Sequence, residues 1–410
     1  MKRQRSTTST HPAHSGYQSP ASTTQRIEAL DLVRGAAILG TLGTNIWIFT
    51  DPSGPAGWLR AMGDRDGSLA DVVESLLLFL VNGKSVALLS IMFGVGLELQ
   101  YRSARRRGLA WPGRYLWRCV LLLLEGALHY LLIFEFDVLM GYALVAMYVS
   151  VLVRARTKVR YWWMATAALL HTGVIALLTL GMHTGNVALS PRGWTGTTLY
   201  SHGGWLEQVH SRIADIGTYR AELVIVIPMS TVLFLAGVEL VRAGAFTEAP
   251  HGTAIRTRLI RWGLGFGVPV NLVTTFAGQE WFFVDRYVLP PVVAFGLLGL
   301  IVELAYRTRG RSGPLRSGLV STGRTAMSCY VFQNLLSSAL CYGWGLGLAT
   351  TLDPARPWWV IAAWCAVVGT FMVLASWWLR HFRRGPLESA MHWAYEPRGP
   401  ARPWRLDTSR

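Results

Sequence analysis

Residues 26–35 read R-I-E-A-L-D-L-V-R-G and run directly into the apolar segment 36–49. Asp31 and Arg34 are three residues apart, so a helix places both side chains on one face. Asn45 follows Asp31 by fourteen residues, close to four helical turns, and extends the same polar stripe. Because a helix surrounded by lipid would not carry this stripe, we predict a membrane helix whose polar face meets protein. An ion pair that anchors the cytoplasmic end of a first span is the alternative interpretation.

The composition is that of an integral membrane protein. Of the 410 residues, 51% are hydrophobic, only 15% are charged and 18 are tryptophan, which is too apolar for a soluble chain of this length. The formal net charge is +16, but the arginines stand in short clusters between apolar runs, as membrane topology produces. A basic stripe interleaved with aromatic residues, typical of nucleic-acid binding, is absent from the sequence. We therefore expect a lipid bilayer as partner and no nucleic acid.

Cysteine and histidine spacing gives no sign of a disulfide framework or a metal site. The four cysteines all fall in apolar segments without C-x-x-C spacing, and the ten histidines are scattered without an H-E-x-x-H motif. A phosphate-binding glycine loop and a G-x-S-x-G nucleophile motif are also missing from the sequence. We expect no bound metal.

Ten apolar segments predict an all-α fold, a polytopic membrane bundle of about ten transmembrane helices, because one span needs about 20 residues. The predicted spans are 30–49, 70–100, 114–134, 137–153, 160–181, 219–241, 258–277, 284–306, 325–348 and 357–380. The second is unusually long and is expected to break around Asn82-Gly83-Lys84. We count it as one crossing, although a re-entrant piece followed by a span also fits.

The arginine clusters predict the orientation. They lie near residues 102–114, 154–160, 242–261, 307–316 and 380–384, all on one side of the membrane under this topology. That side is expected to be the cytoplasm. Both termini then face the cytoplasm of the inner (plasma) membrane, and the long loop 182–218 lies outside.

Three domains follow from this organisation. Residues 1–25 are polar and are predicted to form a disordered cytoplasmic tail. Residues 26–394 form the transmembrane helical domain, and residues 395–410 form a second cytoplasmic tail. A homo-oligomer is compatible with this organisation.

A carboxylate and an imidazole share one face of the third predicted span. Glu125 and His129 are four residues apart, and Asp137 opens the next span. A carboxylate one turn from an imidazole can orient it and keep it basic. A histidine that bonds to a carbonyl of a neighbouring helix is the alternative.

Lys84 lies inside an apolar run. A buried lysine must pair with an acid, lose its proton or reach a charged ligand such as a phosphate. An ion pair with Glu74, Asp71 or Asp31 fits the sequence equally well. Arg324, at the cytoplasmic end of the ninth span, is either a ligand for an anion or a further topology anchor.

Five motifs in order resemble the YeiB-like bacterial membrane proteins, known as the domain of unknown function 418. The first is R-I-x-x-L-D-x-x-R-G with Asn45 on the same helix. The others are Gly83-Lys84 with Ile91-Met92-Phe93-Gly94-Val95-Gly96, Gly126-Ala127-Leu128-His129 with Asp137-Val138-Leu139, Gly323-Arg324-Thr325-Ala326-Met327-Ser328 with Tyr330 and Gln333, and Gly385-Pro386-Leu387-Glu388. The resemblance covers nearly the whole chain after residue 25.

The family is grouped with transmembrane acyltransferases, including heparan-glucosaminide N-acetyltransferase, whose first helix also pairs D-x-x-R-G with a downstream Asn. The resemblance therefore implies transfer from a cytoplasmic acyl-CoA to a hydroxyl or amine, on a small molecule or a glycan. The glycosaminoglycan enzymes carry a catalytic His shortly after that Asn, whereas residues 46–65 contain none. His129 is the best substitute for the missing base.

These considerations assign a role to each candidate residue. The expected catalytic residues are His129, Glu125, Asn45 and Asp137. The residues expected to attract the phosphates of the donor are Lys84, Arg34 and Arg324. Asp31 and Gln333 are expected in a structural polar core. A small-molecule transporter or exporter remains the alternative, with the broken helix at Gly83-Lys84 in its favour, and a structural scaffold is a third possibility.

Overall fold

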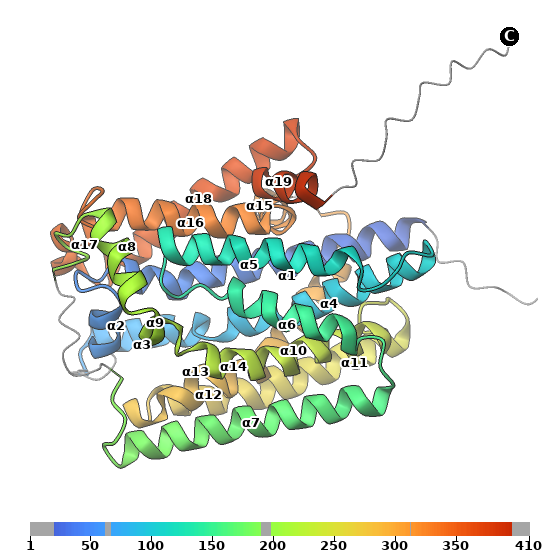
Figure 1. Ribbon diagram of the computed structural model, residues 1–410, viewed down its shortest axis with the longest axis horizontal. Helices are drawn as coiled ribbons and strands as arrows, with labels where there is room; N and C mark the ends of the chain where they lie inside the picture. The colour runs from blue at the N-terminus through green and yellow to red at the C-terminus, as the bar shows by residue number, and fades with distance from the viewer. Residues whose placement is uncertain (1–19, 62–66, 190–197, 312, 396–410) are drawn as a thin grey trace, which may run out of the picture.

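The computed structural model describes residues 20–61, 67–189, 198–311 and 313–395. Throughout these residues every regular element is a helix, which confirms the all-α prediction (Figure 1). The first helix begins at Pro20, ten residues before the predicted span 30–49. Most of the two predicted tails, 1–25 and 395–410, lies outside the described residues.

The helices fall into two groups by length. The helices that run along the bundle are α1 (Pro20–Phe49), α4 (Lys84–Arg106), α5 (Arg114–Leu132), α6 (Leu139–Leu152), α7 (Thr157–His183), α10 (Leu223–Arg242), α14 (Leu289–Arg307), α16 (Ala326–Cys341) and α18 (Trp358–His381). The shorter elements are α2 (Pro55–Ala61), α3 (Leu69–Val81), α8 (Trp205–Ala214), α9 (Ile216–Arg220), α11 (Pro250–Trp262), η1 (Gly263–Gly267), α12 (Val268–Thr275), η2 (Gln279–Trp281), α13 (Phe282–Tyr287), α15 (Pro314–Arg324), α17 (Leu348–Thr351), η3 (Asp353–Ala355) and α19 (Pro386–Tyr395).

All ten predicted spans coincide with helical residues, but they differ in their ability to cross a bilayer. In the described part of the chain, seven helical segments are long and apolar enough to span a membrane, and α6 is a shorter apolar helix. The predicted span 258–277 is divided among α11, a π-helical turn η1 and α12. The predicted span 325–348 contains α16, which has only 16 residues. The chain is therefore a polytopic helix bundle, and seven segments of the described residues meet the length and apolarity expected of a full span.

The second predicted span breaks where the sequence indicated. Asn82 and Gly83 separate α3 from α4, and Gly83 has a φ of 69°, a conformation that favours glycine. The 23 residues of α4 extend about 35 Å, enough to cross the hydrocarbon core without α3.

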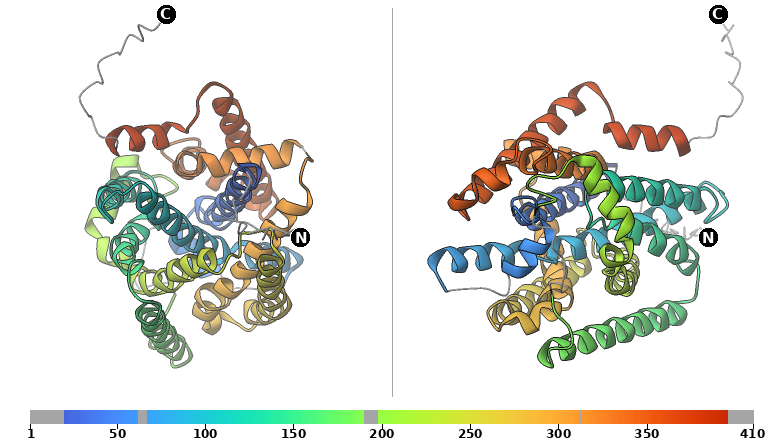
Figure 2. Two further views of the ribbon diagram at one scale, coloured as in Figure 1. Left: turned by 90° about the vertical axis from the view of Figure 1, so that its right-hand side faces the viewer. Right: turned by 60° about the vertical axis from the view of Figure 1, so that its left-hand side comes forward.

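Helix α1 occupies the middle of the bundle, as its polar stripe predicted. It packs against α4, α14, α15, α16 and α18, and it lies near the centre when the bundle is viewed along its helices (Figure 2). Glycines allow the closest approach, because a Cβ on Gly35 would lie 2.1 Å from the Leu319 carbonyl oxygen. A Cβ on Gly323 would lie 1.8 Å from the Asp31 carbonyl oxygen. Two motif glycines thus hold α1 and α15 in backbone contact.

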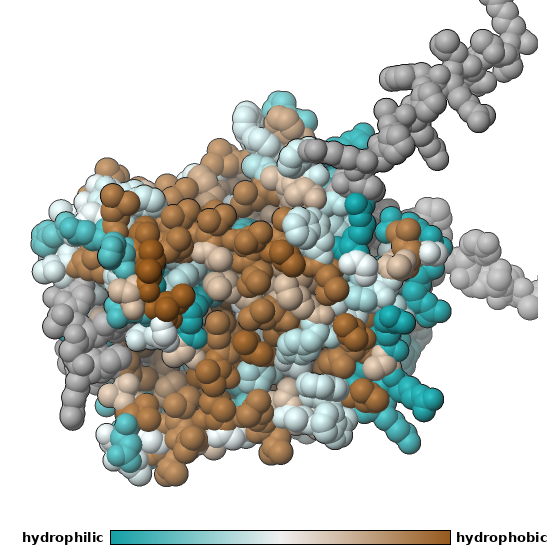
Figure 3. All heavy atoms as spheres, viewed as in Figure 1, coloured by the Kyte–Doolittle hydropathy of each residue, from teal (hydrophilic) through white to brown (hydrophobic). Residues whose placement is uncertain are grey.

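The rim of the bundle is apolar. Helix α7 stands at the edge in both views of Figure 2, and four of its leucines are well exposed, namely Leu169, Leu170, Leu177 and Leu180. Brown, apolar side chains cover the middle of the molecule in Figure 3. Such a surface is expected of helices in contact with lipid.

The arginine clusters gather at one end of the bundle. The ends of α4, α6, α10, α14 and α18 point to the right in Figure 1, and hydrophilic side chains are concentrated at the right-hand end of Figure 3. We call this the arginine-rich end and the opposite end the outer end. The prediction that the clusters share one side is confirmed.

Candidate functional site

His129 lies in the interior between α5, α6 and α16, with 2% of its surface exposed. Its Nδ1 is 3.2 Å from Asp137 Oδ1, an ion-pair distance without the alignment of a hydrogen bond. Its Nε2 is 3.1 Å from Asn334 Nδ2. The ring of Tyr330 packs on the imidazole with 5.0 Å between ring centroids. Both ring nitrogens therefore face side chains that can fix the orientation of the ring.

Local structure explains how Asp137 reaches the imidazole. Its other oxygen, Oδ2, accepts a hydrogen bond of 3.1 Å from the Met140 backbone N–H, in the first turn of α6. A Cβ on Gly126 would lie 2.7 Å from that nitrogen and 2.9 Å from Asp137 Oδ2. The spacing Gly126-x-x-His129 thus lets α5 approach the start of α6 and brings the carboxylate to the imidazole.

Asn334 connects this pair to the central helix. Its Oδ1 accepts a hydrogen bond of 3.2 Å from Asn45 Nδ2 on α1. A continuous row of polar side chains therefore runs from Asp137 through His129 and Asn334 to Asn45. Asn334 is fully buried. Periodicity alone could not show that it, rather than the predicted Gln333, meets the histidine.

Several polar atoms beside this row have no partner among the described residues. They are both carboxylate oxygens of Glu125, both amide atoms of Gln333 and the hydroxyl of Ser337. An unpaired buried polar group costs free energy, so such groups normally bind water or a ligand. The interior beside His129 can therefore bind water or a polar ligand.

The structure brings Asp137, rather than Glu125, into the orienting position beside His129. Glu125 is one turn away on the same helix, as predicted, but its carboxylate forms no hydrogen bond with the imidazole. Asp137 and Glu388 are close enough to interact with Glu125 electrostatically. The i,i+4 spacing identified the shared face correctly, but the chain reversal between α5 and α6 presents a closer carboxylate.

The predicted pair on the first helix forms. Arg34 Nη1 is 3.2 Å from Asp31 Oδ1, with 9% of the Asp31 side chain and 33% of the Arg34 side chain exposed. Arg324 interacts electrostatically with Asp31, so Arg34 and Arg324 flank the same carboxylate. The pair is half-buried and lies toward the arginine-rich end.

Lys84 does not join these two arginines, contrary to the prediction of one site for three cations. It lies at the start of α4, where its ammonium group bonds to the Phe79 carbonyl and sits 4.5 Å from the centroid of the Phe79 ring. Arg34 reaches α4 near Gly96, twelve residues and about 18 Å further along the helix. Its electrostatic neighbour is Asp285, whereas the sequence suggested Glu74, Asp71 or Asp31.

Glu388 caps the N-terminus of α16. The motif Gly385-Pro386-Leu387-Glu388 did not reveal this role. Its Oε1 accepts hydrogen bonds from the backbone N–H groups of Met327, at 2.8 Å, and Ser328, at 3.2 Å. Its Oε2 accepts one of 2.5 Å from the Ser328 hydroxyl. A carboxylate at a helix N-terminus is favoured by the helix dipole, so α19 caps α16 from a distant part of the chain.

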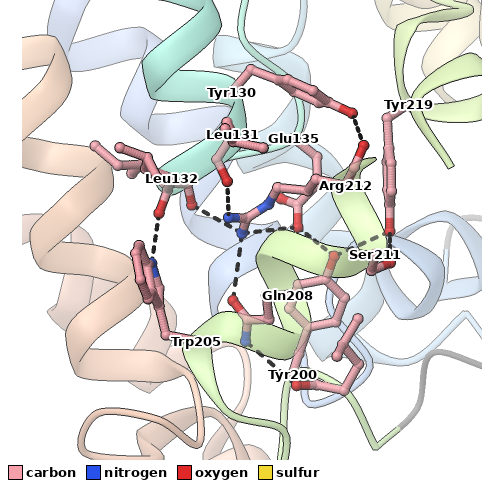
Figure 4. Close-up of polar contacts among 12 residues, drawn as sticks. Tyr130, Leu131, Leu132, Glu135, Tyr200, Trp205, Gln208, Ser211, Arg212 and Tyr219 are labelled. Carbon is pink, nitrogen blue, oxygen red and sulfur yellow. Dashed lines mark hydrogen bonds and ion pairs between the residues drawn. The ribbon is translucent and has the colours of Figure 1, made fainter. Parts of the chain in front are cut away.

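A second buried polar cluster lies at the outer end (Figure 4). Arg212 on α8 donates to the carbonyl of Leu131 at 3.1 Å, to that of Ile133 at 3.2 Å and to Glu135 Oε1 at 3.3 Å. Burial raises the pKa of Tyr200, which donates from its hydroxyl to the same Glu135 oxygen. We call these residues, with Gln208, the Arg212 cluster. It fastens the loop helix α8 to the end of α5.

The two nitrogens of His129 determine what this site can do chemically. If Nδ1 carries the proton and points to Asp137, the lone pair of Nε2 is directed into the interior, where it can accept a proton. The Asn334 amide nitrogen lies beside Nε2, and the Asn45 amide donates in turn to the Asn334 oxygen. In the described part of the chain, no group of three or more His, Cys, Asp or Glu side chains is arranged to hold a metal ion.

The fold and this site define a multi-pass helical membrane protein with a buried histidine–carboxylate pair. Residues 240–397 match the family described as a protein of unknown function, DUF418. The chain is 26% identical over 405 residues to the uncharacterized protein YxaH of Bacillus subtilis (strain 168), covering 92% of this chain and 97% of that protein. It is 28% identical over 393 residues to the uncharacterized protein YeiB of Escherichia coli (strain K12), covering 89% and 94%. These similarities support the YeiB-like family that the five motifs predicted.

Proposed function

We propose that this protein is a membrane acyltransferase, which moves an acyl group from a cytoplasmic acyl-CoA to a hydroxyl or amine acceptor. The observation that carries the proposal is the contact of His129 with Asp137 on one side and with buried amides on the other. Acyl transfer needs a proton acceptor of near-neutral pKa and a donor for the developing oxyanion, and this row of residues offers both.

These residues account for every proton and bond that changes during the transfer. The acceptor occupies the place beside Nε2 that the Asn334 amide now fills, and His129 takes its proton. The acceptor oxygen or nitrogen then forms a bond to the thioester carbonyl, whose oxyanion the Asn334 and Asn45 amides stabilise. The C–S bond breaks, and the CoA thiolate receives the proton from His129. Asp137 stabilises the imidazolium between these two proton transfers.

Acyl-CoA binding is tested on the purified protein in detergent by thermal unfolding. A ligand at about 100 times its Kd stabilises the folded state by about 2.7 kcal/mol. We expect acetyl-CoA to raise the unfolding midpoint and the same concentration of pantetheine, which lacks the nucleotide, to raise it less. An unchanged midpoint at millimolar acetyl-CoA contradicts the proposal.

A transporter is the second candidate, and one observation favours it. Buried Lys84 follows a helix break at Asn82-Gly83, and broken helices with buried charge are typical of transporter sites. The transporter becomes the better explanation if acetyl-CoA neither binds nor is consumed and Lys84→Met leaves folding intact but changes the uptake or export of metabolites by whole cells.

We also propose that the arginine-rich end faces the cytoplasm of the inner membrane, since basic residues are retained on that side. Reporter fusions after Arg156 and near Gly203 are expected to report opposite compartments, with the fusion after Arg156 in the cytoplasm. The same compartment for both fusions contradicts this orientation.

A further inference from the structure

A pocket of about 740 Å³ opens at the arginine-rich end, where the end of α14 meets α1 and the start of α15. The charged residues that line it are Arg309, Arg311, Arg316, Arg324 and Glu28. We call it the arginine pocket. Four guanidinium groups thus face one carboxylate around a single hollow.

Arg316 forms the fixed wall of the arginine pocket. Its Nε donates to Glu28 Oε1 on α1 at 2.9 Å, and its Nη1 donates to the Thr308 hydroxyl at 2.6 Å. Its Nη2 donates to the Ala305 carbonyl of α14 at 3.3 Å. Arg316 therefore joins three helices, and its charge is largely balanced by Glu28.

The other cations of the pocket are less well balanced. Arg309 pairs with Glu248. Arg324 donates to the Arg383 carbonyl at 3.4 Å and shares Asp31 with Arg34 as an electrostatic partner. Arg311 has no ion-pair partner among the described residues. Retention of the loop in the cytoplasm accounts for the number of arginines in it, but not for their arrangement around a hollow. The surplus positive charge fits an anionic ligand.

Arginine geometry narrows the chemistry of that ligand. The planar guanidinium group presents parallel N–H donors that match phosphate oxygens, and several converging arginines are typical of phosphate recognition. A pocket of this volume holds more than a single inorganic ion, because small-molecule sites measure about 300–1,000 Å³. A nucleotide with several phosphate groups fits both the charge and the size.

We propose that the arginine pocket binds the phosphate-bearing nucleotide portion of the acyl-CoA donor, with Arg311 as the principal phosphate ligand. The choice of this nucleotide rests on the proposed acyl transfer. Arg324 ends α15, and Asn334 follows it by ten residues, about 15 Å along the helical axis. The long pantetheine arm of CoA is suited to connect the pocket with the row around His129.

The test measures the Kd of 3′-phospho-ADP, the nucleotide portion of CoA, for the purified full chain in detergent. Arg311→Ala is expected to raise the Kd about tenfold or more, since one charge-assisted contact is lost. Arg311→Lys keeps the positive charge but loses the parallel N–H donors of the guanidinium group. Its Kd should lie between those of the wild type and Arg311→Ala. Arg106→Ala is the matched control, because Arg106 is an exposed arginine at the same end, and it should leave the Kd unchanged.

Two outcomes overturn the proposal. The first is an equal Kd for the wild type and Arg311→Ala when both have the same unfolding midpoint without ligand. That result would show that the nucleotide does not bind in this pocket. An anionic lipid headgroup is the other source of phosphate. If 3′-phospho-ADP does not bind, but nanodiscs with phosphatidylglycerol stabilise the wild type more than Arg311→Ala, the ligand is lipid.

The arginine pocket and the acyl transfer can fail separately. Nucleotide binding that depends on Arg311, without any consumption of acetyl-CoA, supports the pocket and contradicts the enzyme. Acetyl-CoA consumption by Arg311→Ala with the wild-type KM supports the enzyme and contradicts the pocket.

Discussion

The Arg212 cluster and the row around His129 are both buried, yet their polar atoms are satisfied to different degrees. The two Nη groups of Arg212 reach two carbonyls, Glu135 and Gln208, and only its Nε lacks a partner. Beside His129, the whole amide of Gln333 and the whole carboxylate of Glu125 lack partners among the described residues. In the first cluster Arg212 Nε and Glu135 Oε2 are the unpaired atoms, but both residues bond through their other atoms and fasten a loop. In the second, whole polar groups are left for water or a ligand to satisfy.

The largest stability effect should follow the loss of the Arg212 guanidinium. Arg212→Ala leaves Glu135 buried without its cation, and breaking a buried pair in this way costs about 3–5 kcal/mol. Denaturant unfolding in detergent micelles measures the loss. Thiol reactivity can report the transition, since Cys119, Cys329 and Cys341 are buried in the folded chain.

Removal of both charges provides the control for that variant. Arg212→Met combined with Glu135→Gln leaves no unpaired charge, so it should be more stable than Arg212→Ala alone. Equal destabilisation by the single and double variants would show that packing, rather than the ion pair, holds α8 on α5.

A smaller effect is expected at Glu388, a carboxylate near the His129 row that is nevertheless fully bonded. Glu388→Ala removes the cap of α16 and should cost about 0.5–2 kcal/mol, the usual value for a helix N-cap. Glu388→Gln keeps an acceptor oxygen and should cost less. Stability equal to that of the wild type in Glu388→Ala would mean that the N-terminus of α16 does not depend on α19.

The same substitution in the two clusters gives the sharpest contrast. Gln208→Leu removes an amide that bonds to Arg212 and to the Leu199 carbonyl, so it should destabilise by about 1–3 kcal/mol. Gln333→Leu removes an amide without partners, so the free energy of unfolding should stay within about 1 kcal/mol of the wild type or rise. Similar losses in the free energy of unfolding for both variants would show that the two buried amides do not differ in how well they are hydrogen-bonded.

Helical periodicity correctly predicted the features that belong to a single helix. Asp31 and Arg34 pair on one face of α1, and Asn45 continues the stripe toward the interior. The break at Gly83 was predictable because a glycine beside a charged residue interrupts an otherwise apolar run. Apolarity also indicated the membrane. It did not show that α16 has only 16 residues or that α11 is joined to α12 through a π-helical turn.

Contacts between helices were harder to predict, because spacing along one helix does not show which neighbour a face meets. Glu125 shares a face with His129, yet Asp137 reaches the imidazole from the next helix. Lys84 and Gly96, beside which Arg34 lies, both belong to α4, but the twelve residues between them correspond to about 18 Å along the helix. Arg311 was interpreted only as part of a topology signal, since a sequence does not show a pocket.

The central claim is that His129 is the base for acyl transfer. The most direct measurement is the release of CoA thiol from acetyl-CoA by the protein in lipid nanodiscs, supplied with a bacterial envelope extract as the source of acceptors. Wild type should release CoA, and His129→Ala should reduce the rate by about 10²–10⁴, the usual effect of a lost general base, while retaining the Kd for 3′-phospho-ADP. Release of CoA by folded His129→Ala at the wild-type rate would contradict the account.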